Sequence, residues 1–351
     1  MKKINIKIIN KPTCYDIIID SNLIRNINNF IISNNNYSSF VLVYDSNVPL
    51  PFIDDIKNLL NNCILIPMDL SINTKKSIDQ FMIIQSELIR NNIDKNTLVI
   101  SIGGGSLGDL VGFVSSTYYR GIDYIQIPTT LLSMIDSSIG GKTGLDLKKG
   151  KNLIGTFYHP KAVLISTEFL QSLNNEEIIS GLFEAIKYGI TFDVDLFLFI
   201  KDNKNNVFKS DILLRIIEWC CKIKSDIVIE DEKDGNIRNK LNFGHTIGHP
   251  IESIYEIRHG EAVAIGMLFA ARLSKKMNTL NIDDYQQIVD LINHFDLPKI
   301  SINVNSIINK LTKDKKRING KNNFILLNSI GSSYISDDVN IDQIKEILLE
   351  I

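Results

Sequence analysis

The first half of this chain alternates short apolar runs, rich in β-branched residues, with longer segments of helical period. The apolar runs cover residues 5–9, 15–20, 40–45, 63–68, 97–105, 124–128 and 162–166. Several of them are almost continuously apolar, which is typical of strands covered on both faces. Between two of these runs, residues 77–93 repeat apolar side chains at helical spacing. Strand–helix–strand alternation predicts a largely parallel sheet with right-handed crossovers.

After about residue 166 the period changes and long helical segments dominate. They cover residues 175–190, 211–229, 260–277 and 283–295. Asn174, ahead of Glu176 and Glu177, is the expected start of the first of them. The sequence has no internal repeat and no low-complexity linker, so the change of period alone sets the boundary. We predict an α/β domain with a mostly parallel sheet over residues 1–165, followed by an all-α domain over residues 166–351.

The overall composition excludes several classes of partner. A chain of 351 residues has about the length of two domains, and its formal net charge of −2 gives no attraction to nucleic acid or an anionic membrane. No stretch reaches the ~18 uncharged apolar residues of a membrane span, and the N-terminus lacks the apolar region of a signal peptide. Adjacent Cys220 and Cys221 would make a strained disulfide. We expect reduced thiols and a cytoplasmic protein without nucleic-acid or membrane partners.

Three of the five histidines, His245, His249 and His259, fall within one short segment. Because His245 and His249 stand four residues apart, they share one face of a helix. A glycine follows His259, which is consistent with a turn that brings this side chain back. Imidazole is the commonest metal ligand near neutral pH, and Glu252 and Glu261 lie nearby. The cluster predicts a divalent-metal site; the alternative is a set of exposed or hydrogen-bonded histidines.

A glycine-rich segment follows the apolar run that begins at residue 97. Gly103, Gly104, Gly105 and Ser106 let the backbone approach a ligand closely, and the N–H groups at the start of the next helix favour phosphate. The usual dinucleotide fingerprint belongs to the first strand of its unit, whereas several strands precede these glycines, and Asp123 begins a strand instead of ending one. The segment favours a diphosphate-containing cofactor; the alternative is a tight turn between strand and helix.

A second polar segment covers residues 127–155. It contains the hydroxyls of Thr129, Thr130, Ser133, Ser137 and Ser138 around Asp136, followed by Gly140, Gly141, Lys142 and Thr143. The segment is not a P-loop, because Asp136 occupies the position of the required first glycine. Lys142 is the best candidate for a ligand contact, and the other lysines of the segment have the solvated state as their usual alternative.

Seven segments of the chain together resemble the 3-dehydroquinate synthase family, within the sugar phosphate cyclase superfamily. They are IGGGSLGDLVGFVSSTYYRG, IPTTLLSMIDSSIGGKTGLD, KNLIGTFYHPKAV, GLFEAIKYGI, RNKLNFGHTIGHPIE, RHGEAVAIGM and DKKRINGKNNFILL. They occur in the family's order from about residue 103 to near the end of the chain. The first hundred residues are less distinctive. A chance match to all seven segments is not credible.

The resemblance implies an N-terminal NAD-binding domain, a helical metal- and substrate-binding domain, and an active site between them. It implies tightly held NAD and one divalent metal, usually zinc, with cobalt as the alternative. The sugar phosphate substrate would be 3-deoxy-D-arabino-heptulosonate 7-phosphate, and the products 3-dehydroquinate and phosphate, in the shikimate pathway. The family's reaction combines transient oxidation by NAD, phosphate elimination, reduction, ring opening and aldol closure. The family is usually homodimeric.

The resemblance also implies a set of metal ligands, namely Glu184, His245 and His259. Two imidazoles, one carboxylate and an open position form a catalytic zinc set. His249 is then a substrate or proton-transfer residue. Thr246 excludes the H-E-x-x-H motif of zinc proteases.

The remaining implied site residues divide into substrate and cofactor contacts. Catalytic or substrate contacts are implied for His249, Lys142, Lys187, Lys224, Arg238, Asn242, Asp136, Asn152, Arg120 and Lys316. Arg120 is expected to reach the site of a neighbouring subunit. NAD contacts are implied for Asp45, Lys76, Gly103, Gly104, Gly105, Ser106, Asp109, Thr129, Thr130, Lys142 and Lys151.

Three positions depart from the family's pattern. Asn73 stands where a glutamate is expected, which leaves ribose binding to Asp45 alone. Asp234 replaces the usual glutamate and reaches less far. Pro250 replaces a small residue, and unless it lies in a first helical turn it would shift His249.

Three other functions remain as alternatives. A 2-deoxy-scyllo-inosose synthase shares fold, NAD and metal, but Arg238 and the lysine of the late DKK motif suit a substrate carboxylate. A metal-dependent polyol dehydrogenase of the same broad fold would release NADH at every turnover. A non-catalytic NAD-binding or zinc-stabilised protein would unfold on loss of Glu184.

Overall fold

Among the residues that the structure describes, the N-terminal half contains a parallel sheet of six strands in the order β1-β8-β5-β4-β2-β3. The computed structural model describes residues 13–20, 27, 37–70, 76–147, 150–313 and 323–350. The strands are β1 (Asp16–Ile19), β2 (Ser39–Asp45), β3 (Cys63–Met68), β4 (Thr97–Gly103), β5 (Tyr124–Pro128) and β8 (Ala162–Ile165). The six strands predicted from residue 15 onwards are confirmed, and the strand predicted at residues 5–9 lies outside the described residues.

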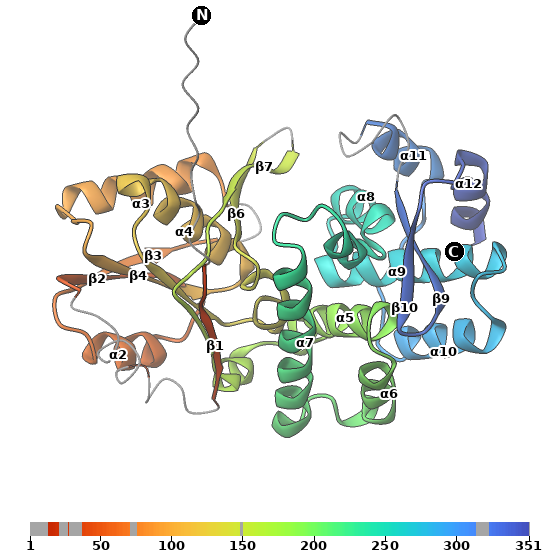
Figure 1. Ribbon diagram of the computed structural model, residues 1–351, viewed down its shortest axis with the longest axis horizontal. Coiled ribbons are helices and arrows are strands. Elements are labelled where there is room, and N and C mark those ends of the chain that lie inside the picture. The colour runs from red at the N-terminus through yellow and green to blue at the C-terminus, as the bar shows by residue number, and fades with distance from the viewer. Residues whose placement is uncertain are drawn as a thin grey trace, which may run out of the picture.

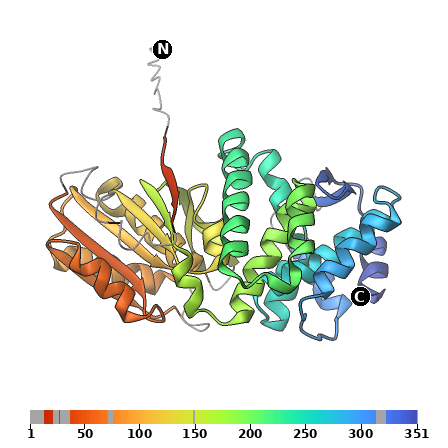
Figure 2. The same ribbon diagram turned by 90° about the horizontal axis from the view of Figure 1, so that it is seen from below.

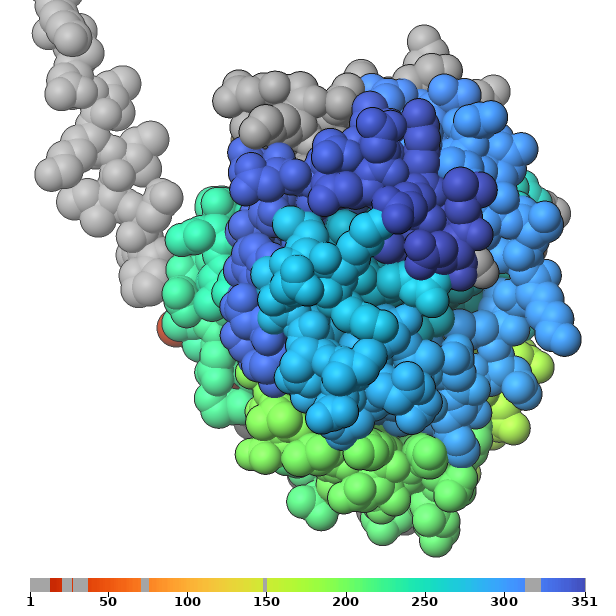
Figure 3. Space-filling view, turned by 90° about the vertical axis from the view of Figure 1, so that its right-hand side faces the viewer, coloured from red at the N-terminus to blue at the C-terminus, as the bar shows by residue number. Residues whose placement is uncertain are grey.

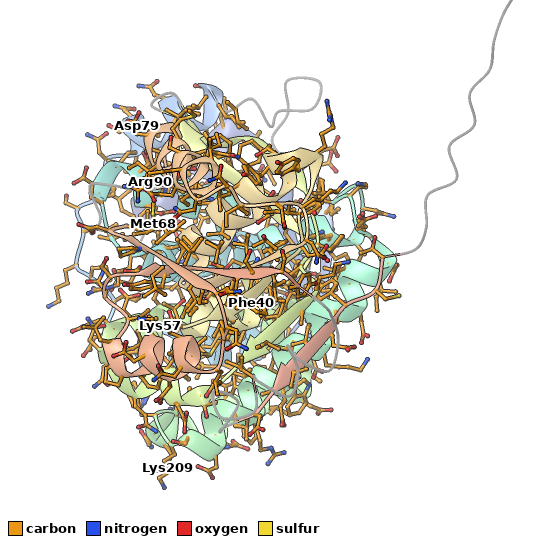
Figure 4. All side chains as sticks on the ribbon, turned by 90° about the vertical axis from the view of Figure 1, so that its left-hand side faces the viewer. Phe40, Lys57, Met68, Asp79, Arg90 and Lys209 are labelled. Atoms are coloured by element: carbon orange, nitrogen blue, oxygen red, sulfur yellow. The ribbon has the colours of Figure 1, made fainter. Side chains whose placement is uncertain are left out.

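Helices cover both faces of this sheet. Helix α2 (Leu50–Asn58) lies on one face, and α3 (Ile78–Arg90) and α4 (Gly105–Thr117) lie on the other (Figure 1). In Figure 4, Asp79 and Arg90 of α3 and Lys57 of α2 mark opposite sides of the strands that carry Phe40 and Met68. Every residue of β4 is buried, which explains its continuous apolar sequence.

An antiparallel hairpin of β6 (Lys142–Leu147) and β7 (Gly150–Phe157) stands beside the sheet. The polar segment at residues 127–155 did not predict these strands, because β7 is exposed along most of its length and therefore lacks a run of apolar residues. The described part of this half also contains a turn of π-helix, η2 (Ser133–Ser137), and a 3-10 turn, η1 (Tyr118–Arg120).

The C-terminal half is mostly helical, as predicted. Its helices are α5 (Asn175–Thr191), α6 (Val194–Asp202), α7 (Ser210–Glu230), α8 (His245–Tyr255), α9 (His259–Lys276), α10 (Ile282–Asn293), α11 (Val304–Lys313) and α12 (Ile341–Glu350). Short 3-10 helices are η3 (Thr167–Ser172), η4 (Lys204–Asn206) and η5 (Ile237–Asn242). Figure 2 shows from below that the sheet and the helical half lie side by side along the molecule. None of the described helices is long and apolar enough to cross a membrane.

One feature of the C-terminal half corrects the expectation of an all-α domain. Strands β9 (Phe324–Ser329) and β10 (Ser332–Ser336) form an antiparallel hairpin. Phe324 and Leu326 of β9 are buried in the same apolar cluster as Phe269 of α9, so the hairpin covers that helix. Figure 3 shows this end of the molecule, where the C-terminal residues, in blue, form much of the surface. The predicted class, an α/β domain followed by a mostly helical one, is otherwise confirmed.

Candidate active site

Glu184, His245 and His259 converge although they come from three different helices. Glu184 lies within α5, while His245 and His259 are the first residues of α8 and α9. The Nε2 atom of each histidine lies 3.5 Å from Oε1 of Glu184. This carboxylate oxygen is buried and has no hydrogen-bond partner among the described residues. The three side chains therefore direct three potential ligand atoms at one point.

Close packing of α9 against α5 brings His259 to Glu184. Gly260 donates its N–H to Oγ of Ser180 at 3.1 Å, and Ser180 lies one helical turn before Glu184. A Cβ atom at Gly260 would overlap the carbonyl oxygen of Ser180. The glycine after His259 therefore does not form the predicted turn. It lies in the first turn of α9 and permits the contact between the two helices.

The charges around Glu184 keep its carboxylate ionised. Burial raises the pKa of Glu184, but the ion pair with Lys187 and the nearby His245 lower it well below its usual value. Burial lowers the pKa of His245, and Lys187 lowers it further. Burial also acts to lower the pKa of His259, but Glu184 and Glu252 raise it to about 9. Glu184 and His245 are thus in metal-binding protonation states, whereas His259 must lose a proton to bind a cation.

The arrangement fits a four-coordinate divalent cation. Zinc bonds to nitrogen and oxygen of about 2.0–2.1 Å place tetrahedral ligand atoms about 3.4 Å apart, close to the two separations observed. Nδ1 of His245 lies 3.1 Å from the carbonyl oxygen of Phe243, and Nδ1 of His259 lies 3.1 Å from Oε2 of Glu252. Donation of both Nδ1–H groups leaves each Nε2 lone pair for a metal. The site can therefore hold zinc or cobalt with one position open.

A second group of buried charges contains Asp136, Tyr188 and Lys224. The Tyr188 hydroxyl donates to Oδ1 of Asp136 at 2.7 Å, and the Lys224 ammonium contacts the same oxygen. Burial raises the pKa of Asp136, but Lys224 and Lys187 lower it well below its usual value. Burial lowers the pKa of Lys224, and Asp136 opposes that shift. Asp136 is therefore held as a carboxylate between α5 and α7.

Arg238 is buried at the junction of the two halves, and its Nε–H group is unpartnered within the described part of the chain. Its guanidinium donates to the carbonyl oxygens of Glu232 at 2.6 Å and Gly140 at 3.1 Å. Its Nε atom has no partner among the described residues. A buried N–H donor without an acceptor costs about 1–3 kcal/mol. An anionic ligand bound beside Arg238 would supply the missing acceptor. Asn242, at the end of η5, donates to the carbonyl oxygen of Asn239 at 3.0 Å.

The same junction contains two further polar contacts between the halves. Lys142, the first residue of β6, forms an ion pair with Asp234, so the shorter carboxylate does reach a lysine. Nε2 of His159 lies 3.0 Å from Oε1 of Glu232. Both contacts involve the loop between α7 and η5.

Most of the residues implied for NAD lie at the carboxyl edge of the sheet. Gly103 ends β4, Gly104 precedes α4, and Gly105 and Ser106 are the first two residues of that helix. Asp45 ends β2, and Thr129 and Thr130 follow β5. The Thr129 N–H donates to the carbonyl oxygen of Gly103 at 3.0 Å. A Cβ at Gly103 would overlap Leu107, and one at Gly105 would lie 2.5 Å from Ser137 Oγ. Glycine here leaves a helix N-terminus open, which fits a dinucleotide diphosphate.

Asn152 and Lys151 do not lie with the residues of the sets to which the resemblance assigns them. Lys76 forms an ion pair with Asp109 and lies 2.5 Å from Oδ1 of Asn152, so a residue implied for substrate lies with two implied for NAD. Burial raises the pKa of Asp109, and Lys76 opposes that shift. Lys151, implied for NAD, instead forms an ion pair of 2.7 Å with Glu252 of the helical half.

Arg120 lies away from the glycine loop of its own chain. It is exposed, has a φ of 61°, and follows the C-terminal end of α4. The glycine loop lies at the other end of this 13-residue helix, a distance of roughly 20 Å at 1.5 Å per residue. Lys316 and Asn73 lie outside the described residues.

Pro250 lies beyond the first turn of α8, yet the helix continues through it to Tyr255. The ring centroids of His245 and His249 are 5.1 Å apart, so the two side chains still share one face. The ring of His249 also lies 5.9 Å from that of His259. Pro250 therefore does not separate the three histidines.

Sequence reasoning missed the contacts of Tyr188 and the position of Glu252. Tyr188 and Lys187 follow Glu184 by four and three residues in α5, so helical spacing alone would have placed them on its face. Glu252 was considered only as a possible ligand near the histidines. The structure places it behind His259, on the ring nitrogen that faces away from Glu184.

The fold and the site define a class of protein. An α/β domain with a glycine loop suited to a dinucleotide is followed by a mostly helical domain that carries a candidate metal centre. Among solved structures, 2-deoxy-scyllo-inosose synthase is similar with a TM-score of 0.87 and 26% identity, over 95% of this chain and 96% of that one. The 2-epi-5-epi-valiolone synthase of Streptomyces hygroscopicus has a TM-score of 0.89 and 23% identity, over 98% of each chain. The fold is thus that of sugar phosphate cyclases.

The chain belongs to the 3-dehydroquinate synthase family. Residues 69–180 match the family model of the 3-dehydroquinate synthase N-terminal region, and residues 181–317 match that of the C-terminal region. A 3-dehydroquinate synthase from Colwellia psychrerythraea is 40% identical over 95% of this chain and 97% of its own length. The family resemblance and the function predicted from the sequence motifs are confirmed.

Proposed function

We propose that this chain converts 3-deoxy-D-arabino-heptulosonate 7-phosphate to 3-dehydroquinate and phosphate with bound NAD and one divalent cation. The observation that carries this proposal is the unpartnered Oε1 of Glu184, which lies 3.5 Å from the Nε2 atoms of both His245 and His259. The similar cyclase structures contain NAD+ with Zn²⁺ or with Co²⁺, which supports both cofactors. Glu184, His245 and His259 hold the cation, and the carboxyl edge of the sheet holds NAD.

The side chains around this centre prepare it for a polyhydroxy substrate. When bound, NAD supplies a reversible hydride acceptor and the cation acidifies a coordinated hydroxyl. Lys187 keeps Glu184 ionised. Tyr188 and Lys224 both contact Oδ1 of Asp136, so Oδ2 is the oxygen available to accept a hydrogen bond from a substrate hydroxyl.

The substrate carries a carboxylate and a phosphate, and buried or partly buried cations are available for both. Arg238 has an unused Nε–H at the junction of the two halves. Lys142 is half exposed on the same junction, where Asp234 holds it until an anion competes. We assign Arg238, Lys142, Lys224 and Asn242 to substrate binding, and His249 to proton transfer beside the metal ligands. Lys316 and Asn152 complete the implied substrate set.

The decisive experiment measures phosphate release from the heptulosonate phosphate before and after treatment with a chelator. We expect the chelated protein to lose turnover and to recover it when Zn²⁺ or Co²⁺ is added back. Glu184→Gln should keep the fold, as judged by circular dichroism, and lose turnover with or without added metal. Full activity of this variant would contradict the assignment of Glu184.

Two measurements separate this proposal from its alternatives. Glucose 6-phosphate is the test substrate for a 2-deoxy-scyllo-inosose synthase, and turnover of that compound alone would contradict the proposed substrate. Absorbance of NADH at steady state tests for a polyol dehydrogenase, because the proposed reaction returns the hydride and accumulates none. An unfolded Glu184→Gln variant, with no turnover by the wild type, would indicate a structural metal instead.

We further propose that the protein is a homodimer. Leu153, Ile154 and Phe157 of β7 expose 52%, 41% and 38% of their surface. Met82 and Ile83 of α3, a helix that packs against β6, expose 53% and 49%. Among the described strands, β7 pairs only with β6, so one of its edges remains open. Apolar side chains beside an open strand edge favour association with a second copy.

A cytoplasmic location is consistent with four free cysteines.

A further inference from the structure

Glu252 contacts both a proposed metal ligand and the opposite half of the molecule. Its Oε2 atom lies 3.1 Å from Nδ1 of His259, and its Oε1 atom lies 2.7 Å from the Lys151 ammonium. Glu252 belongs to α8, whereas Lys151 belongs to β7 of the exposed hairpin. The carboxylate side chain is only 16% exposed. One carboxylate thus connects a metal ligand to the domain that carries the nucleotide loop.

The contact with His259 determines how this imidazole faces the metal position. When Nδ1–H donates to Glu252, the lone pair of Nε2 is directed to Oε1 of Glu184, 3.5 Å away. A carboxylate acceptor also makes the imidazole a stronger electron donor and fixes the rotation of its ring. His245 has a backbone acceptor for the same purpose, the carbonyl oxygen of Phe243. His259 is half-buried and relies on a side chain.

The same atoms also permit a different interpretation, in which Glu252, His249 and His259 hold a second cation. Two observations argue against it. The Lys151 ammonium already supplies positive charge to Glu252. In addition, Nδ1 of His259 cannot both donate a proton to Glu252 and bind a cation. A hydrogen bond therefore accounts for the geometry better than a metal bond.

We propose that Glu252 is a positioning residue that orients His259 for metal binding, and that Lys151 holds Glu252 in place from the β6–β7 hairpin. The inference rests on the proposed metal centre at Glu184, His245 and His259. Because Lys151 is 47% exposed, its contribution is smaller than that of Glu252. The strength of metal binding in the helical half thus depends on a lysine of the other half.

The test is a titration of the metal-free full-length protein with Zn²⁺ in competition with a chromophoric chelator. We expect Glu252→Ala to raise the zinc dissociation constant by about 10- to 100-fold, the usual effect of removing such a partner. Glu252→Gln keeps the volume and an acceptor oxygen, so we expect a smaller rise. Lys151→Met should raise the dissociation constant by less than Glu252→Ala. The Co²⁺ form of Glu252→Ala should show an altered visible spectrum, which a merely structural role would not produce.

A matched control is Glu261→Gln, two residues from His259, whose carboxylate caps α9 at Arg258 and contacts no metal ligand. We expect it to bind zinc like the wild type. Thermal melting of each metal-free variant separates loss of fold from loss of affinity, and Glu252→Gln keeps the test valid if Glu252→Ala does not fold.

The outcomes distinguish this inference from the proposed function. If the wild type binds no zinc, the proposed metal centre itself is wrong. If the wild type binds zinc and Glu184→Gln does not, but Glu252→Ala and Glu252→Gln bind it with unchanged affinity, only the positioning role is overturned. Binding of two Zn²⁺ ions by the wild type and one by Glu252→Ala would make Glu252 a ligand and would also overturn it.

Discussion

Asp136 is the counterion of a buried lysine, because Lys224 has no other carboxylate contact among the described residues. Lys224 is only 8% exposed, so removal of the carboxylate leaves a buried ammonium group without its counterion. At pH 7 we expect Asp136→Asn to lower the free energy of unfolding by about 3 kcal/mol, measured by urea denaturation. Tyr188→Phe removes only one hydrogen bond to Asp136 and should cost about 1 kcal/mol.

The effect of this substitution should depend on pH. The pKa of Asp136 in the folded protein lies well below its usual value of about 3.9, so its contribution to stability is complete above that usual value and is lost as the pH falls further. We expect the difference between wild type and Asp136→Asn to stay constant from about pH 7 to 5 and to shrink below about pH 4. A difference that grew towards acid pH would contradict the ionised state assigned to Asp136.

For individual residues, the sequence predicted the kind of site better than it predicted the contacts within the site. The spacing of the histidines indicated a metal site, but it could not reveal Glu184, which lies 61 positions before His245 and looks like an ordinary helix residue. Only the family motif pointed to it. Motif position assigns Lys151 to NAD and Asn152 to the substrate, whereas Lys151 contacts Glu252 of the helical half and Asn152 contacts Lys76. The two residues are neighbours in β7, and successive side chains of a strand point to opposite faces.

Helix α8 contains a proline at its sixth position, which lowers the stability of the helix. Pro250 has no N–H for the carbonyl oxygen of Thr246, and such a residue costs about 3 kcal/mol in a helix interior. Pro250→Ala regains this helix energy but removes two buried CH₂ groups, which contribute about 1.6 kcal/mol. We therefore expect the free energy of unfolding to rise by about 1 kcal/mol. Thermal unfolding measures the change. Pro160→Ala, in a buried loop position, is the control and should only destabilise.

The crossing of α5 and α9 gives a second prediction for an element. An alanine normally stabilises a helix by about 1 kcal/mol relative to glycine, but in Gly260→Ala the new Cβ would overlap the Ser180 carbonyl oxygen. We expect a net loss of about 1–3 kcal/mol and weaker zinc binding, because His259 would move away from Glu184. Gly108→Ala in α4 meets only the flexible Gln126 side chain, so zinc affinity should remain at the wild-type value there.

The elements predicted correctly are strands buried on both faces and helices buried on one face, because each leaves a regular apolar pattern in the sequence. The strands of the central sheet are mostly apolar, and helical periods are clear in α3, α5, α7, α9 and α10. The β6–β7 hairpin was missed because β7 exposes nearly every side chain, so its sequence carries no alternation. The β9–β10 hairpin was missed because its short apolar run lies between helices and resembles a buried helix segment.

For the whole molecule, the central prediction concerns shared active sites. If Arg120 serves the site of a partner subunit, Arg120→Ala and Glu184→Gln should each be inactive alone. A mixture of the two should regain about a quarter of the wild-type turnover, because half of the dimers are mixed and each of these contains one complete site. Phosphate release after unfolding and refolding the mixture measures this. Activity of Arg120→Ala alone would contradict the shared site, and the mixture would then show no complementation.

The interface itself can be tested independently. Leu153→Asp introduces a charge on the open edge of β7, where the side chain is 52% exposed. We expect this variant to be monomeric in sedimentation while its unfolding temperature under metal-free conditions stays near that of Lys209→Ala, an exposed residue that precedes α7 and lies outside the hairpin. A dimer that persists in Leu153→Asp would place the interface elsewhere.

The two-half organisation was predictable from the change of period near residue 166, but the junction was not, because its contacts join residues far apart in sequence. Arg238 and Gly140 are 98 positions apart, and Lys151 and Glu252 are 101 apart. No local pattern encodes such pairs. We propose residues 1–165 and 166–351 as the two domains of the chain.

All three proposed metal ligands come from closely packed helices of one half, while the glycine loop belongs entirely to the other. Neither group needs the other's ligand in order to form. We therefore expect the metal-free protein to bind the dinucleotide and the dinucleotide-free protein to bind zinc, which equilibrium titrations with each ligand alone would measure. Either half-loaded form would then need only the second ligand, without refolding.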